Sequence, residues 1–276
     1  MMQGGFNPVA FSIGPLTIRW YGVAMALSIF LAIWYLLRKG KSLGIKEEAL
    51  LTMSFLAVIC GLIGARLVFV AANHPDWFWR KPVQIFKVYE GGLAWHGGLL
   101  GGVAAAWWYL RFRVRISFNL VADLAVPGLG LGYSLIRVAN IINQEILGRP
   151  TDFSFGRWPA QSVGIGIGIF LFIRYFYLDR YRLPIGYQFW SFVFYHQILR
   201  GLLEETIRDM PLVIAVYLNR SWGMGFFTAA QVATLPILLF VWRMWPRKDQ
   251  EASPTIAPPT DRRGKTTAKR RRERSG

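Results

Sequence analysis

Residues 49–72 read ALLTMSFLAVICGLIGARLVFVAA, and Arg66 is the charged residue within this apolar run. A helix needs roughly 20 residues to cross about 30 Å of hydrocarbon, so the stretch is long enough to span a membrane. Placing an arginine near the centre of such a helix costs about 2.5–3.5 kcal/mol. The stretch therefore predicts a membrane span that carries a functional charge.

Similar apolar stretches recur along the chain. The predicted spans are residues 17–37, 49–72, 93–110, 119–142, 161–178, 185–203 and 225–245. In the fourth, Pro127 and its neighbouring glycines predict a break in the helix that allows close packing. The chain is 54% hydrophobic and 17% charged, which is ordinary for a polytopic membrane protein and excessive for a soluble one. We predict an all-α polytopic membrane protein with seven transmembrane helices.

Basic residues alternate between the connections of these spans. The first, third and fifth connections and the C-terminal stretch together carry 21 Lys and Arg, eleven of them from Arg243 to the end, and the opposite side carries eight. The positive-inside rule places the C-terminus in the cytoplasm and, with seven spans, the N-terminus outside. We predict a transmembrane domain over residues 1–246. Residues 247–276 are predicted to be a disordered basic tail on the cytoplasmic side, in contact with anionic lipid headgroups.

Composition also excludes some classes of partner. No aromatic or folded reader accompanies the basic tail, so we expect no nucleic-acid partner. Cys60 is the single cysteine, so the chain offers no intramolecular disulfide and no cysteine cluster for a metal. We expect no metal site and no cofactor.

Several polar residues whose burial in a membrane costs free energy lie toward the ends of the spans that face the outside in this topology. Helical spacing puts Arg137 and Asn140 on one face, and Arg200 and Glu204 are spaced to pair at i and i+4. The group comprises Arg66, His96, Arg137, Asn140, Asn143, Glu145, Arg200 and Glu204. Its arginines outnumber the carboxylates, which indicates an anionic partner such as a phospholipid phosphate. The alternative is a purely structural role, in which these residues form a polar network that joins helices.

His96 stands among glycines, with Gly97 and Gly98 directly after it. Glycine lets backbone or ligand approach closely. Two roles for His96 stay open, namely proton transfer or hydrogen bonding to a substrate, and a structural hydrogen bond between helices.

Several ordered motifs carry a family resemblance. They are FSIGPLTIRWYG at residues 11–22, GARLVFV at 64–70, YEGGLAWHGGLLGG at 89–102, RVANIINQEILGR at 137–149, LRGLLEE at 199–205 and AAQVATLPILL at 229–239. With these motifs the chain resembles the prolipoprotein diacylglyceryl transferase family over most of residues 9–245.

The resemblance implies a seven-span enzyme of the bacterial inner membrane. Such an enzyme would move the diacylglyceryl group of phosphatidylglycerol to the lipobox cysteine of a prolipoprotein and release glycerol phosphate. Its catalytic candidates are Tyr21, His96, Arg137 and Arg200. Its substrate-binding candidates are Arg66, Gly97, Gly98, Asn140, Asn143, Glu145, Gly148, Arg149 and Glu204. His96 would be the candidate base, while Arg137 and Arg200 would stabilise the departing phosphate.

One segment departs from the family pattern. Residues 157–164 read RWPAQSVG where the family usually has Arg-His-Pro-Ser-Gln-Leu-Tyr-Glu, and the loop before it is short. A non-catalytic phospholipid-binding or transport protein, and a structural membrane component, are therefore the alternative hypotheses.

Overall fold

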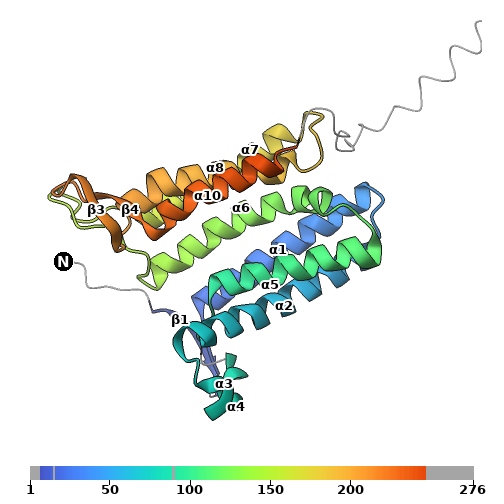
Figure 1. The fold of residues 1–276 in the computed structure, drawn as a ribbon, viewed down its shortest axis with the longest axis horizontal. Helices are drawn as coiled ribbons and strands as arrows, with labels where there is room; N and C mark the ends of the chain where they lie inside the picture. The colour runs from blue at the N-terminus through green and yellow to red at the C-terminus, as the bar shows by residue number, and fades with distance from the viewer. Residues whose placement is uncertain (1–6, 15, 89–90, 247–276) are drawn as a thin grey trace, which may run out of the picture.

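The computed structural model describes residues 7–14, 16–88 and 91–246. Within these ranges the chain forms a mainly helical bundle whose strands lie at one end (Figure 1). The predicted basic tail, residues 247–276, lies outside the described residues. The domain boundary at residue 246 therefore stays a prediction.

Among the described residues, four helices are long and apolar enough to cross a membrane: α1 (Trp20–Ser42), α2 (Glu47–Asn73), α6 (Phe118–Ile142) and α7 (Ala160–Leu178). The remaining predicted spans are also helical in large part. They correspond to α5 (Trp95–Trp108) with the π-helix η2 (Tyr109–Val114), to α8 (Tyr187–Leu199) with the π-helix η3 (Arg200–Glu204) and α9 (Glu205–Ile207), and to α10 (Ala229–Met244). Short helices α3 (Trp77–Arg80) and α4 (Pro82–Ile85) lie between α2 and α5. A mainly helical fold of membrane-protein character is confirmed.

The all-α prediction missed two antiparallel hairpins. One pairs β1 (Val9–Ile13) with β2 (Leu16–Arg19), and the other pairs β3 (Leu212–Asn219) with β4 (Met224–Thr228). The sequence of β3, LVIAVYLN, is rich in β-branched side chains. Gly223, with a φ of +63°, lies in the turn before β4. These local signals favour a hairpin between the predicted sixth and seventh spans.

The predicted break at Pro127 is wrong, because α6 is continuous from Phe118 to Ile142. The close packing expected there is present, since a Cβ added to Gly128 would lie 2.4 Å from the Cβ of Ala32 in α1. On another side of α6, a Cβ on Gly130 would lie 3.1 Å from the carbonyl oxygen of Gly168 in α7. Neighbouring helices therefore pack closely against α6 next to the proline.

Helices α2 and α5 also meet through glycines. A Cβ added to Gly64 would lie 2.4 Å from the carbonyl oxygen of Gly97, and a Cβ on Gly101 would lie 2.3 Å from that of Cys60. Small residues at such a seam let two helix backbones approach closely, which is the usual way membrane helices associate. This close contact sets the position of α5 along α2.

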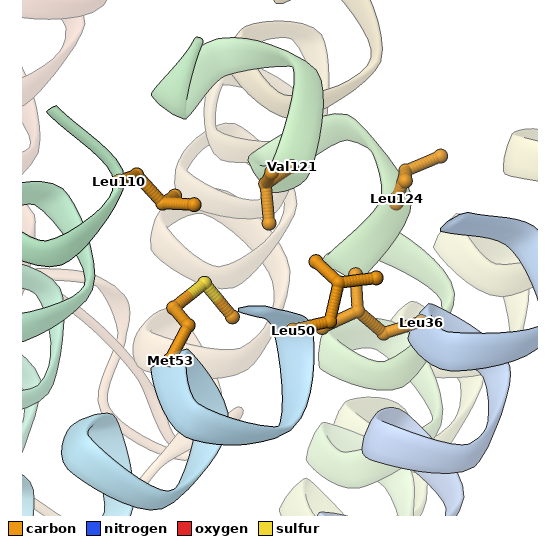
Figure 2. Packing of buried hydrophobic residues seen from close by; sticks show 6 residues of the cluster. All are labelled: Leu36, Leu50, Met53, Leu110, Val121 and Leu124. Atoms are coloured by element: carbon orange, nitrogen blue, oxygen red, sulfur yellow. The ribbon is translucent and has the colours of Figure 1, made fainter. Parts of the chain in front are cut away.

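A buried apolar cluster ties the helices together at the end of the bundle where α1 ends and α2 and α6 begin (Figure 2). Its members are Leu36, Leu50, Met53, Leu110, Val121 and Leu124. Elsewhere, large apolar side chains such as Phe30, Phe55 and Leu239 are more than half exposed, as expected for a surface that faces lipid. Tyr133, Arg137 and Asn140 lie toward the other end of α6.

Candidate active site

The C-terminal half of α6 presents three polar side chains on one face. Tyr133, Arg137 and Asn140 are spaced i, i+4 and i+7, so they lie above one another. The Arg137 guanidinium donates to the Asn140 amide oxygen at 3.1 Å and to the Tyr133 hydroxyl at 2.9 Å. Arg137 is 6% exposed, so its charge needs a partner within the protein.

Glu204 provides that partner. One of its carboxylate oxygens lies 2.6 Å from Nη2 of Arg137, and the other accepts a hydrogen bond from Tyr133. Glu204 is fully buried. Tyr133, Arg137 and Glu204 therefore form a closed ion-pair network between α6 and η3.

The predicted i, i+4 pair between Arg200 and Glu204 is wrong. Arg200 instead forms an ion pair with Glu205, with 2.7 Å between Nη2 and Oε1. The cause is the π-helical turn Arg200–Glu204, in which bonds run from i to i+5 and the residue stacked on Arg200 is one position further along. The same turn frees Glu204 to reach Arg137.

Glu205 is almost fully buried and has several partners. Its Oε1 accepts from Arg200 and from Arg208 at 2.7 and 2.9 Å, and its Oε2 accepts from the Thr228 hydroxyl at 3.3 Å. Thr228 is also the N-cap of α10, where its side chain and that of Gln231 form a capping box. Glu205 thus connects the site to the base of the second hairpin and to the start of α10.

Glu145 follows α6 and is held by amides. Asn140 donates to one carboxylate oxygen at 3.0 Å, Asn143 donates to the other at 3.4 Å, and Gln161 donates to the Glu145 backbone carbonyl at 2.8 Å. The Tyr21 hydroxyl, at the start of α1, lies within electrostatic range of Glu145 and Arg137. Tyr21, Asn143 and Glu145 therefore lie at the end of the bundle that also holds the predicted site residues Arg137, Asn140, Arg200 and Glu204.

Gly148 and Arg149 lie under the second hairpin. A Cβ on Gly148 would lie 1.9 Å from the carbonyl oxygen of Trp158, so this close approach requires glycine. The Arg149 guanidinium donates to the Met210 carbonyl at 2.7 Å and lies 5.9 Å from the centre of the Tyr217 ring. These contacts fasten the hairpin to the segment that follows Glu145.

Arg66 lies against a different part of the chain. It donates to the backbone carbonyls of four residues in the connection between α2 and α5: Gln84, Ile85, Gly91 and Gly92, at 2.5–3.1 Å. Its guanidinium also lies 5.8 Å from the ring centres of Phe69 and Trp77. No contact described for Arg66 joins it to Arg137. A direct role in binding substrate stays a prediction.

His96 lies in the first turn of α5 and is exposed, with its ring edge-on to Trp95 at 5.3 Å between centroids. Gly97 and Gly98 face α2, where a Cβ on Gly97 would lie 2.2 Å from the Gly64 carbonyl oxygen. In the described part of the chain, no hydrogen bond or ion pair connects His96 with the Arg137 network. Its role as a base stays a prediction.

Four residues of the site were missed by the sequence analysis. They are Tyr133, His196, Glu205 and Arg208. The His196 ring packs edge-on against Tyr133 at 4.8 Å and lies within electrostatic range of Arg137 and Arg200. Tyr133 is four residues before Arg137, and that spacing was the available signal. Glu205 and Arg208 follow the π-helical turn, which decides where they point, whereas His196 lies in α8 before that turn.

The charged groups of the site are guanidinium groups and the carboxylates that hold them. Among the described residues, no group of three or more His, Cys, Asp or Glu side chains is placed to hold a metal ion. Guanidinium groups backed by buried carboxylates are suited to recognising phosphate and to stabilising charge on a departing oxygen.

Comparisons with known proteins agree over nearly the whole described chain. The family model described as prolipoprotein diacylglyceryl transferase matches residues 8–245. A relative from Caldanaerobacter subterraneus subsp. tengcongensis is 54% identical over 238 residues, covering 86% of this chain and 92% of the relative. One from Thermoanaerobacter sp. is 52% identical with the same coverage. A relative from Thermus thermophilus is 34% identical over 82% of this chain and 93% of its own length. All three are named phosphatidylglycerol–prolipoprotein diacylglyceryl transferase.

Proposed function

The chain belongs to the prolipoprotein diacylglyceryl transferase family, and on that premise we propose that it transfers the diacylglyceryl group of phosphatidylglycerol to a prolipoprotein. The acceptor is the thiol of the lipobox cysteine, and the other product is glycerol phosphate. In this reaction a carbon–sulfur bond forms at the glyceryl carbon while its bond to the phosphate oxygen breaks. The thiol proton must be accepted, and the departing phosphate gains negative charge.

The buried arginine–carboxylate network is the observation that carries this proposal. Arg137 and Arg200 lie at one end of the bundle, on α6 and on the π-helical turn after α8, and each guanidinium is held by a buried carboxylate. Preorganised cations of this kind stabilise charge that develops in the transition state without further reorganisation. Asn140, Asn143 and Glu145 lie beside them and supply groups that hydrogen-bond a glycerol headgroup.

We assign the proton-accepting role to His96. A thiol with an ordinary pKa of about 8.5 is mostly protonated at neutral pH, so attack on the lipid requires a base or a nearby cation. His96 is exposed in the first turn of α5, close to the connection that Arg66 holds. Arg66, Gly97 and Gly98 then support the reaction by placing His96, and Arg149 and Gly148 do so by anchoring the hairpin.

The membrane arrangement is part of the proposal. Seven spans, an outer N-terminus and a cytoplasmic C-terminus place the network at the outer face of the bacterial inner membrane, where the lipobox cysteine of a prolipoprotein is exposed. The excess of basic residues in the predicted cytoplasmic connections supports this orientation. The basic residues 247–276 would contact anionic headgroups on the other face.

The test is transfer of labelled diacylglyceryl from phosphatidylglycerol to a lipobox peptide by the full chain in nanodiscs. A thioether-linked product that disappears in Arg137→Gln and Arg200→Gln supports the proposal. Retained lipid binding without any thioether product would reject it and would favour the non-catalytic phospholipid-binding alternative. The altered segment 157–164 motivates that alternative, although Gln161 from this segment still bonds to the Glu145 backbone.

A further inference from the structure

A basic hollow lies where η2 meets α6, at the end of the bundle opposite the arginine–carboxylate network. Its volume is about 200 Å³, and it is lined by Arg111, Arg115, Ile116 and Ser117. A water molecule takes about 30 Å³ of liquid volume, so the hollow has room for a group of several non-hydrogen atoms, such as a phosphate. The reaction proposed above uses none of these residues.

The end of η2 brings the two arginines to one hollow. Arg115 adopts a left-handed conformation with a φ of +59°, and its backbone N–H donates to the carbonyl oxygen of Leu110. The chain turns sharply there, so that Ile116 packs against the apolar cluster of Figure 2, which includes Leu110 and Val121. The side chains of Arg111 and Arg115 stay exposed. Buried residues on both sides of the turn therefore hold the hollow in place.

The protein does not neutralise the positive charge of this hollow. The acidic residues at this end of the bundle, among those that the structure describes, are Glu47, Glu48, Asp123 and Asp179. None of them lies within ion-pair distance of Arg111 or Arg115. Asp179 pairs with Lys39 instead, and Asp123 accepts hydrogen bonds from backbone N–H groups at the start of α8.

The start of α6 adds positive potential at the same place. Ser117 lines the hollow and is also the N-cap of this 25-residue helix. Its side chain makes no capping hydrogen bond, and the first turn of α6 holds no acidic residue. The first N–H groups of a helix have no partner within the helix and favour an anion. Together with two guanidinium groups they match a phosphate, which offers several acceptor oxygens.

Exposed aromatic rings place the hollow at the level of lipid headgroups. Trp107, Trp108 and Phe112, at the end of α5 and in η2, are all exposed. The guanidinium of Arg113 lies 5.4 Å from the ring centre of Trp108. Tryptophan beside long basic side chains is typical of the boundary between hydrocarbon and water at the end of a membrane helix. A ligand of the hollow therefore meets it from the lipid surface.

We propose that this hollow binds the phosphate group of an anionic phospholipid. Arg111 and Arg115 donate to the phosphate oxygens, and the acyl chains lie against the exposed aromatic side chains of α5 and η2. With the topology proposed above, this lipid belongs to the cytoplasmic leaflet, so it is separate from the donor lipid at the outer face. It fastens the connection between η2 and α6 to the membrane.

The test is photolabelling of the full chain in phosphatidylcholine nanodiscs that contain a phosphatidic acid with a diazirine close to its glycerol. Mass spectrometry maps the label, which we expect on residues 109–118. Arg111→Gln and Arg115→Gln should each lower this label about tenfold, because each removes a charged hydrogen bond to phosphate. Arg113→Gln is the matched control, since it removes the same charge from the same turn without lining the hollow. It should leave the label nearly unchanged.

Three results would overturn the inference. An equal fall in all three variants would show that the label follows the general positive charge of this end of the bundle. Absence of label from residues 109–118, or label that neither substitution lowers, would exclude a site there. Loss of label when inorganic phosphate is added at the concentration of the lipid probe would identify a soluble phosphate as the ligand.

Two controls keep this inference separate from other causes. An unchanged thermal unfolding midpoint in Arg111→Gln and Arg115→Gln shows that a fall in label reflects binding and not a loss of fold. Both variants should also form the thioether product at the rate of the unmodified protein, because they lie far from the arginine–carboxylate network. The labelling result does not depend on that activity, so failure of one proposal leaves the other standing.

Discussion

Replacing Glu204 by alanine tests whether the Arg137 network is as buried as the structure shows. The two charged atoms are 2.6 Å apart, and the exposed fractions of the side chains are 8% for Arg137 and 0% for Glu204. Removing one partner of such a pair leaves an uncompensated buried charge, which costs about 3–5 kcal/mol. Tyr133 loses its acceptor in the same change. We expect Glu204→Ala to lower the free energy of unfolding by about that amount.

The assay is unfolding of the purified protein in mixed micelles, followed by labelling of Cys60. This half-buried residue of α2 is the single cysteine of the chain, so its reactivity reports opening of the bundle. Asp209→Ala is the matched control, because it breaks the Arg157 pair, whose side chains are 49% and 46% exposed. An exposed pair is worth about 0–1 kcal/mol.

Two results would refute this reasoning. One is a loss in Glu204→Ala no larger than that in Asp209→Ala. The other concerns the double replacement Arg137→Leu with Glu204→Leu, which removes both charges and fills the space with apolar groups. It should recover much of the lost stability, because no charge is left unpaired. A double variant less stable than Glu204→Ala would show that the pair is not the reason for the loss.

Three substitutions give sharper local tests. Gly164→Ala should lower kcat/KM at least about tenfold, because its Cβ would lie 2.7 Å from Nε of Arg137 and displace the guanidinium. Gly166→Ala is the control, because a Cβ at this position on the same helix meets open space, and it should leave kcat/KM unchanged. Gly97→Ala should cost about 1–3 kcal/mol in the free energy of unfolding, since it forces α5 away from α2. Arg66→Lys should make the connection before α5 more sensitive to protease, because an ammonium cannot reach the backbone carbonyls that the guanidinium spans.

Each of these predictions has a clear contrary outcome. Equal activity of the Gly164 and Gly166 variants would show that α7 does not support Arg137. A stability loss in Gly97→Ala no larger than in Gly22→Ala, where a Cβ meets nothing within 4 Å, would remove the argument for a tight seam. Unchanged protease sensitivity in Arg66→Lys, together with weaker lipid binding, would return Arg66 to the substrate-binding role predicted from the sequence.

Much of the site followed from local rules of spacing. Arg137 and Asn140 were placed on one face because α6 is a regular helix, and the structure joins them by a hydrogen bond. The same rule failed for Arg200, because a π-helical turn changes which residue stacks above it. Nothing in the local sequence indicates such a turn, so Glu205 and Arg208 were not found.

Composition and apolar runs determined that this chain is a helical membrane protein, because a lipid environment accepts few other ways of satisfying the backbone. They also marked the buried arginines as costly and therefore informative. Only the tertiary structure decided which group pairs with each arginine. Glu204 pairs with Arg137, Glu205 pairs with Arg200, and backbone carbonyls accept hydrogen bonds from Arg66. A charge in a low-dielectric interior must be met at hydrogen-bond distance, and that distance depends on how separate helices pack.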